Sequence, residues 1–227
     1  MQVPLRLYSL DELRLNGIEA SSLLSPVDAT LGSIERNLQL AAALGGLAAW
    51  NVLGFSPQQV LYFSLGLLFL WTLDSHEAGH FLIAYLVGIL PKGYTLTSLE
   101  ALKKEGSLNV QAGTAFVDFE FVEETLNRFS CIALAGVAAE YLLYGIAEGG
   151  LADVNKLDML LKSLAFTQKK ADSQVRWSVL NTVLLLRRHE LARAKLAEAM
   201  SMGKSIGTCI GIIEETIDDS DIQLQLG

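Results

Sequence analysis

The sequence has few of the residues on which several common classes of protein depend. It contains only 2 cysteines, Cys131 and Cys209, in no CxxC spacing, so neither a disulfide scaffold nor a cysteine-rich zinc site is expected, and both thiols are predicted to be buried. Lysine and arginine number 17 against 25 acidic residues, with no basic stripe. Nucleic acid is therefore not expected as a partner, because phosphate binding requires clustered basic side chains. The first residues show no basic region followed by an apolar run, so no secretory signal is expected.

Apolar residues, in contrast, are abundant. They make up 51% of the 227 residues, and the mean hydropathy of +0.37 raises the prospect of contact with a membrane. Residues 38–55 and 60–90 are apolar on nearly all sides, and Ser56 and Pro57 between them are typical of the start of a helix. Apolar runs of this length fit a membrane-embedded helical hairpin and a buried soluble helix pair about equally well.

The pattern along the chain predicts a mainly α fold with a small β-sheet or hairpin. The expected segments are an N-terminal lead-in (1–30), an apolar helical hairpin that could lie in a membrane (31–73), a main domain (74–217) and an acidic tail (218–227). Residues 114–121 alternate between apolar and polar side chains, which indicates a strand, and residues 94–99 and 107–113 are its candidate partners. Helices are expected at 125–144, 153–164 and 205–218, with one long amphipathic element at 172–203.

A polar cluster interrupts the second apolar run. His76, Glu77 and His80 form the pattern H-E-x-x-H, and on a helix the two histidines lie one turn apart on the same face. Two imidazoles in this arrangement can bind one zinc ion, while the glutamate can hold and deprotonate a water molecule. Burying three such groups without a cofactor would cost several kcal/mol unless each found a partner. The motif therefore predicts a Zn²⁺ site with Glu77 as the catalytic base.

A catalytic zinc ion usually takes a third protein ligand, and the motif does not supply it. No further histidine follows His80 at a suitable spacing. His189 is flanked by charged residues in a helix that is predicted to be solvated, so it is not expected to bind metal. The third ligand is then a carboxylate, and the residues alone leave four candidates open: Asp74, Glu140, Asp153 and Asp158.

Three stretches of the chain together resemble the peptidase domain of FtsH-type zinc proteases, in particular the plant and cyanobacterial FtsH-like proteins that lack the ATPase module. The stretches are "HEAGHFLIAYLVGILPKGYTL" (76–96), "IALAGVAAEYLLYG" (132–145) and "GGLADVNKLDMLLKSLAFT" (149–167), and the similarity runs from about residue 74 to at least residue 200. The resemblance implies that Asp153 is the third zinc ligand and that Glu140 orients a histidine. Asp158 stays open as a second choice, because a shift of one helical turn would exchange it with Asp153.

The resemblance also implies where and how the protein would act. It points to a plastid or thylakoid membrane, or to a cyanobacterial one, and to polypeptides as substrates, with a homo-oligomer left open. Residues 203–205 read Gly-Lys-Ser, but a P-loop needs glycine where Glu198 stands and a strand before it, so no ATP site is expected. Proteolysis would then be ATP-independent and limited to unfolded or accessible polypeptides. A substrate could bind by adding a strand beside residues 112–121, although an internal strand without a free edge is slightly favoured.

Three functions fit these expectations. The first is a zinc-dependent endopeptidase in or on a membrane. The second is an intramembrane protease of the site-2-protease type, in which the Leu157-Asp158 pair would supply the last ligand. The third is a proteolytically inactive zinc-binding membrane protein that serves as a chaperone or assembly factor, because metal ligands show a capacity for zinc and not turnover.

Overall fold

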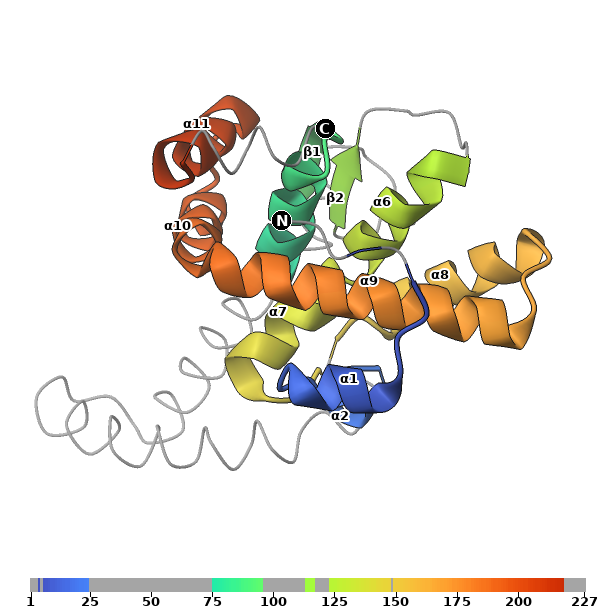
Figure 1. Ribbon diagram of the computed structural model, residues 1–227. Helices are drawn as coiled ribbons and strands as arrows, with labels where there is room; N and C mark the ends of the chain where they lie inside the picture. Colours follow the sequence, from blue (N-terminus) through green and yellow to red (C-terminus); the bar gives the residue numbers. More distant parts are fainter. Residues whose placement is uncertain are drawn as a thin grey trace, which may run out of the picture.

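The computed structural model describes residues 4, 6–24, 75–95, 113–116, 123–147 and 149–218 (Figure 1). The expected apolar hairpin (31–73), almost all of the acidic tail and Asp74 lie outside the described residues. So does the second half of the strand expected at 114–121.

The described part of the chain is mainly helical, as the sequence predicts. Its elements are α1 (Leu10–Leu15), α2 (Ala20–Leu24), β1 (Pro91–Thr95), β2 (Gly113–Phe116), α6 (Glu123–Ala133), α7 (Ala135–Tyr144), α8 (Leu151–Ser163), α9 (Gln168–Arg188), α10 (Glu190–Ser201) and α11 (Ile206–Thr216). Residues 75–86, which carry the H-E-x-x-H motif, are also helical, and we call this stretch the site helix.

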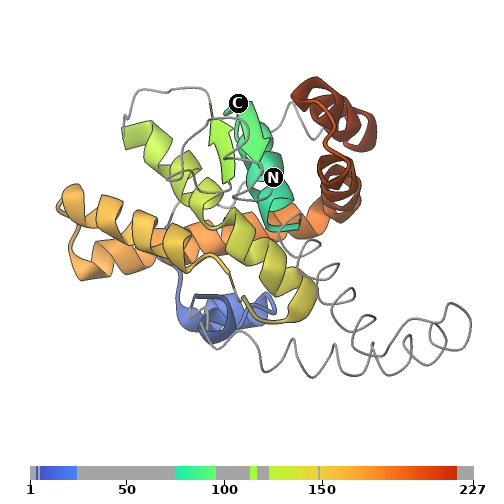
Figure 2. The ribbon, with the colours of Figure 1, turned by 180° about the vertical axis from the view of Figure 1, so that it is seen from behind.

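Helix α9 is the centre of the arrangement. In Figure 1 it crosses the molecule and contacts α6, α7, α1 and α10, while α10 and α11 pack against each other at one end. Figure 2 shows the molecule from behind. Helix α7 follows α6 along the chain, both pack against α9, and α8 runs beside α6. The side chains of the site helix from Phe81 to Ala84 are fully buried, which places this helix inside the core.

The two strands form the small sheet that the sequence predicts. Strands β1 and β2 pair antiparallel, with Tyr94 opposite Thr114, and the register shifts between Pro91 and Gly93. The site helix ends at residue 86 rather than continuing to Leu90, because Gly88 takes a φ of 79°, a conformation that glycine adopts without strain and that commonly ends helices. The chain is thereby turned from the site helix directly into β1.

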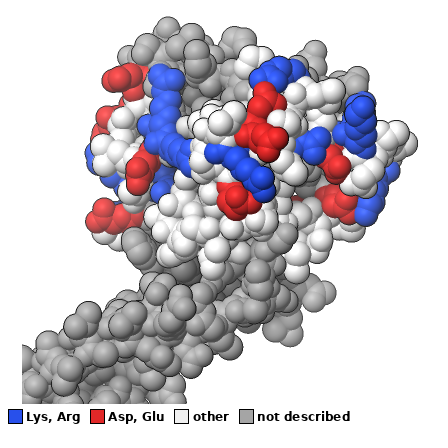
Figure 3. Space-filling model, turned by 60° about the horizontal axis from the view of Figure 1, so that its bottom comes forward, with Lys and Arg blue, Asp and Glu red and all other residues white. Residues whose placement is uncertain are grey.

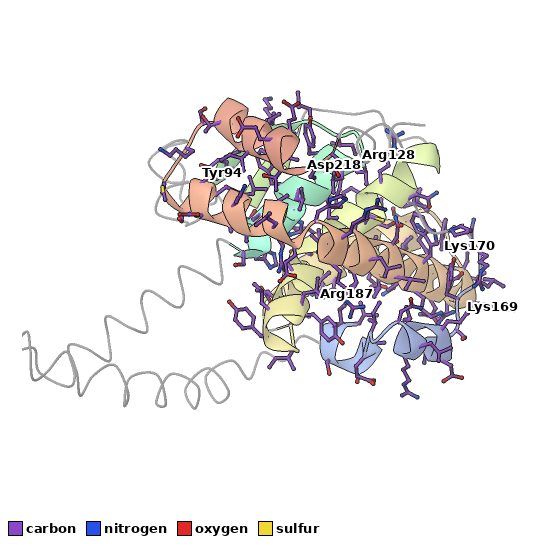
Figure 4. All side chains as sticks on the ribbon, turned by 60° about the vertical axis from the view of Figure 1, so that its left-hand side comes forward. Tyr94, Arg128, Lys169, Lys170, Arg187 and Asp218 are labelled. Atoms are coloured by element: carbon purple, nitrogen blue, oxygen red, sulfur yellow. The ribbon has the colours of Figure 1, made fainter. Side chains whose placement is uncertain are left out.

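The N-terminal segment packs on the helical core. Helix α1 begins with a capping box in which the Ser9 hydroxyl accepts the Glu12 N–H and the Glu12 carboxylate accepts the Ser9 N–H. Leu13 and Leu23 are completely buried. Arg187 of α9 donates hydrogen bonds to the carbonyl oxygens of Asn16 and Gly17, directly after α1 (labelled in Figure 4). The N-terminal lead-in thus contains two short helices.

Two helical expectations need correction. The element expected at 172–203 is two helices, α9 and α10, which meet at His189. His189 was expected in a solvated helix, but only 6% of its surface is exposed. Its charged neighbours Arg188 and Glu190 are exposed while the chain turns the imidazole into the core, so flanking charge was a poor guide to its environment. The helix expected at 125–144 is likewise divided at Leu134 into α6 and α7.

Within the described residues, one stretch is apolar and long enough to cross a membrane. It is Thr125–Tyr144, and 67% of its most apolar window is buried inside the protein, as in the core helix of a soluble protein. The stretch is therefore weak support for a membrane span. On the face shown in Figure 3, basic and acidic side chains are interspersed rather than gathered by sign.

Candidate metal centre

The two histidines of the motif meet on the buried face of the site helix. His76 and His80 are one turn apart, and their Nε2 atoms are 3.1 Å from each other. The rings are arranged edge to face with their centroids 4.8 Å apart. The helical spacing predicted that the side chains would share a face, and the structure shows that the same nitrogen of each ring points to a common centre.

Asp153 brings the third group to this centre from the first turn of α8. Its Oδ2 atom is 3.2 Å from His76 Nε2 and 3.4 Å from His80 Nε2. Asp158 lies elsewhere, because its carboxylate is half exposed and pairs with Lys162 one turn further along the same helix. Of the two aspartates left open by the resemblance, the structure therefore places Asp153 with the histidines and not Asp158.

The hydrogen bonds of the two Nδ1 atoms determine whether the Nε2 atoms of the neutral rings carry a hydrogen or a lone pair. His80 Nδ1 lies 2.7 Å from the carbonyl oxygen of Ile132, which can only accept, so Nδ1 carries the hydrogen. His76 Nδ1 lies 2.8 Å from Glu140 Oε1 and donates to that carboxylate in the same way. Each neutral imidazole has one N–H, so both Nε2 atoms present lone pairs. When both rings are neutral, three acceptors face one another, so the group needs positive charge between them, which a metal ion or a second proton on His76 can supply.

Glu140 is itself held in place. Its second oxygen accepts the backbone N–H of Gly149 at 2.7 Å, and only 6% of the residue is exposed. The role implied by the FtsH resemblance, a carboxylate that orients a histidine, agrees with this geometry. Such outer carboxylates fix the orientation of the ring and raise its basicity as a metal ligand.

Glycines allow the helices to approach closely enough for these contacts. A Cβ atom at Gly136 of α7 would lie 2.3 Å from His76 Nε2, and one at Gly79 of the site helix would lie 2.7 Å from the carbonyl oxygen of Ala135. At Gly149 a Cβ atom would lie 2.5 Å from Glu140 Oε1. The sequence pattern gave no sign that Gly136 lies directly against the His76 ring.

The charges around the centre strongly favour a cation. Burial by itself lowers the pKa of His76, but hydrogen bonds to Asp153 and Glu140 outweigh it and raise the pKa of His76 to about 10. Burial likewise raises the pKa of Asp153, yet hydrogen bonds to His76 and His80 leave it far below its usual range. The carboxylates therefore stabilise positive charge at the point where the three acceptors meet.

The donor set and its distances fit a zinc ion. Two imidazole nitrogens and one carboxylate oxygen are ligands that catalytic zinc takes, with a further position for water. Tetrahedral bonds of about 2.0 Å separate neighbouring ligand atoms by about 3.3 Å. The three separations here are 3.1, 3.2 and 3.4 Å. Among the described residues, His76, His80 and Asp153 form the one group of histidine, cysteine and acidic side chains that could hold a metal ion.

The structure also places the other residues that the sequence analysis singled out. Glu77 is 7% exposed, and its charge helps to raise the pKa of His76, so its carboxylate lies near the centre. Both Cys131 and Cys209 are buried, which confirms the expectation for the thiols.

The Gly-Lys-Ser sequence is a turn between two helices, in which Ser205 caps α11 by accepting the N–H of Thr208. Helix α10 precedes it, not a strand, so the exclusion of a P-loop is confirmed.

No protein family's sequence profile matches the chain, and no curated protein or solved structure is significantly similar to it. A function is therefore argued from the motifs and from the geometry of this centre.

Proposed function

We propose that this chain is a zinc-dependent endopeptidase that acts without ATP on unfolded or accessible polypeptides at a membrane. The observation that carries the proposal is the meeting of His76 Nε2, His80 Nε2 and Asp153 Oδ2 as three acceptors, with an acidic side chain next to them in the H-E-x-x-H pattern. The proposed setting, a plastid, thylakoid or cyanobacterial membrane, rests on the FtsH-like motifs and on the apolar segments of the sequence.

Each residue has a distinct part in this function. His76, His80 and Asp153 would hold the zinc ion, which when bound would polarise the scissile carbonyl and make a water molecule acidic at neutral pH. Glu77 accepts the proton of that water and passes it to the leaving nitrogen, as a general base and then a general acid. Glu140 and the Ile132 carbonyl accept the Nδ1 hydrogens and thereby hold both rings with Nε2 directed toward the ion.

The first test separates turnover from metal binding. Zinc content and casein cleavage are measured for the wild type, for Glu77→Gln, and for Glu198→Gln on an exposed surface of α10 as a matched control. Loss of the base is expected to lower cleavage by about 10²- to 10⁴-fold while the zinc content stays at one ion per chain. The control should keep both properties.

Two other outcomes of this assay have definite meanings. A zinc-loaded wild type that cleaves no protein or peptide would contradict the peptidase and support an inactive zinc-binding chaperone or assembly factor. Equal cleavage by the wild type and Glu77→Gln would remove Glu77 from the reaction.

The second test concerns the third ligand. Asp153→Asn is compared with Asp158→Asn, which changes the same side chain in the same helix but at a half-exposed position. Asp153→Asn should lose zinc during dialysis against a weak chelator, because an amide oxygen is a much poorer ligand than a carboxylate. Asp158→Asn should retain it, and similar retention by both variants would contradict the assignment of Asp153.

A further inference from the structure

A second site is suggested by a cleft at the other end of α8, where the chain turns into α9. The cleft has a volume of about 410 Å³, within the range of small-molecule sites. Arg6, Lys169 and Lys170 line it together with Leu7, Thr167, Ser173 and Gln174. No carboxylate is among the described residues that line it, although the protein as a whole has a net charge of −8. We propose that this cleft binds a phosphate ester.

The position of the two lysines is the main argument. Lys169 and Lys170 stand in the first turn of α9, and Figure 4 shows both at the end of the molecule where this helix begins. The N-terminus of a helix already carries positive partial charge, so acidic residues are favoured there and lysines are not. Helix α9 has no acidic residue in its first turn. Two cations at this end cost stability in the free protein, and an anion in the cleft would compensate for both at once.

Among the described residues the two lysines have no carboxylate partner, whereas Arg6 pairs with Glu12 and lies over the Tyr8 ring, 4.2 Å from its centroid. Within the described part of the chain, Lys169 makes no ion pair, and Lys170 Nζ lies over the Phe166 ring, 4.0 Å from its centroid. Arg6 is held at the edge of the cleft by Glu12 at 2.6 Å. A phosphate group can accept hydrogen bonds from all three side chains, and charge-assisted bonds of this kind are the strong ones.

Uncharged polar groups complete the cleft. The Thr167 hydroxyl oxygen accepts the N–H of Lys170 at 3.3 Å, which leaves its proton for a bound ligand. Gln174 is nine-tenths buried, and its amide nitrogen is fixed by Asn127 and Ser130. Its amide oxygen makes no hydrogen bond within the described residues and can accept one from a hydroxyl of the ligand. The group that fits is therefore a phosphate ester with a neighbouring hydroxyl.

Two sources could supply this chemistry, a soluble glycerol phosphate or sugar phosphate and the headgroup of a phospholipid. The cleft shares no residue with the metal centre, so the proposal can fail without affecting the proposed function and can hold if that function fails. Both sources can be presented in solution as glycerol 3-phosphate and as short-chain phosphatidylglycerol below its micelle concentration.

The test measures binding of both probes to the full chain by titration calorimetry. The double variant Lys169→Gln/Lys170→Gln is compared with Lys162→Gln/Lys195→Gln, which removes the same charge from exposed positions on α8 and α10. The first variant should bind at least about tenfold more weakly than the wild type, and the second should bind as the wild type does. Lysine-dependent binding of glycerol 3-phosphate assigns a soluble ligand, and lysine-dependent binding of phosphatidylglycerol alone assigns a lipid headgroup.

Two results would overturn the proposal. One is that neither probe binds at about 10 mM, a concentration at which a site with a Kd near 1 mM would be mostly filled. The other is that the two double variants weaken binding equally, which would indicate attraction by net charge alone. The variant Lys169→Gln/Lys170→Gln is expected to fold, because removal of two cations from the start of α9 should raise the Tm of the ligand-free protein.

Discussion

At the scale of single residues, the centre depends on which nitrogen of each histidine carries a hydrogen. The carbonyl of Ile132 and the carboxylate of Glu140 assign the N–H to Nδ1 in both rings. Without these two contacts either ring could turn or change tautomer. The contacts around the rings therefore direct both Nε2 atoms toward Asp153, where a metal ion or, in its absence, a second proton on His76 supplies the positive charge.

The first prediction follows from the proton that this environment favours on His76. Its pKa is raised from 6.5 to about 10, so the folded chain holds the proton more tightly than the unfolded chain does. After treatment with a chelator, the resulting stability should be fully present below pH 6.5 and be lost as the pH rises to 10. We expect the Tm of the chelated protein to fall across this range, as followed by circular dichroism.

The variant Glu140→Gln supplies the comparison for this pH dependence. It removes one of the three carboxylates that raise the pKa of His76, so its Tm should decline less steeply. With saturating zinc the wild type should lose this dependence, because zinc binds the deprotonated ring and gains affinity as the pH rises. A flat Tm for the chelated wild type between about pH 7 and 10 would contradict the assigned environment.

At the scale of elements, the centre is a junction of four helices and one loop, since α6 supplies the carbonyl of Ile132. The site helix supplies the rings, α7 supplies Glu140, and α8 supplies Asp153 from its first turn. Gly150 precedes α8 with a φ of 71°, and a Cβ atom there would lie 2.3 Å from Val137 Cγ2. The short Gly149-Gly150 connection thus lets the start of α8 reach the histidines that α7 already contacts.

The second prediction concerns the packing of α7 against the rings. Gly136→Ala would place a methyl group 2.3 Å from His76 Nε2, a separation that atoms cannot adopt, so the ring must leave the centre. We expect zinc affinity to fall by at least about tenfold, measured by competition with a fluorescent chelator. The matched change Gly211→Ala in α11 meets no atom within 4 Å and should raise the free energy of unfolding by about 0.5–1 kcal/mol. Equal zinc affinity in the two variants would contradict the described packing.

At the scale of the whole molecule, segments far apart in the sequence form one core. The N-terminal segment packs on α7 and α9, and the Tyr141 hydroxyl accepts the N–H of Glu19 at 3.0 Å. At the other end of the chain, Glu214 of α11 accepts a hydrogen bond from Tyr85 of the site helix at 2.6 Å. The helices that form the centre thus contact both ends of the described chain, α7 the N-terminal segment and the site helix α11.

The third prediction tests whether the N-terminal segment contributes to this core. Leu13 is completely buried, whereas Leu15 in the same short helix is 85% exposed. Leu13→Ala should lower the free energy of unfolding by about 3 kcal/mol, because it removes buried methyl groups and leaves a cavity. Leu15→Ala should change it by less than about 0.5 kcal/mol. The comparison is made by denaturant unfolding, and similar losses in both variants would show that the segment does not pack as described.

The sequence by itself determined the local features. The period of a helix places His76 and His80 on one face whatever the rest of the chain does, and apolar periodicity predicts a mainly helical fold with Cys131 and Cys209 buried. The alternation at residues 114–121 correctly indicated a strand, of which Gly113–Phe116 is described. Each of these properties depends on neighbours within a few positions along the chain.

Only the tertiary structure decided which distant groups meet at the centre. Asp153 lies 77 positions from His76, Glu140 lies 64 positions from it, and Ile132 lies 52 positions from His80. Five residues, about 1.4 helical turns, separate Asp153 from Asp158, and the packing of α8 turns only the first toward the rings. The burial of His189 between two charged neighbours was decided in the same way. Such contacts arise from the close approach of helices, and composition and spacing along the chain do not specify that approach.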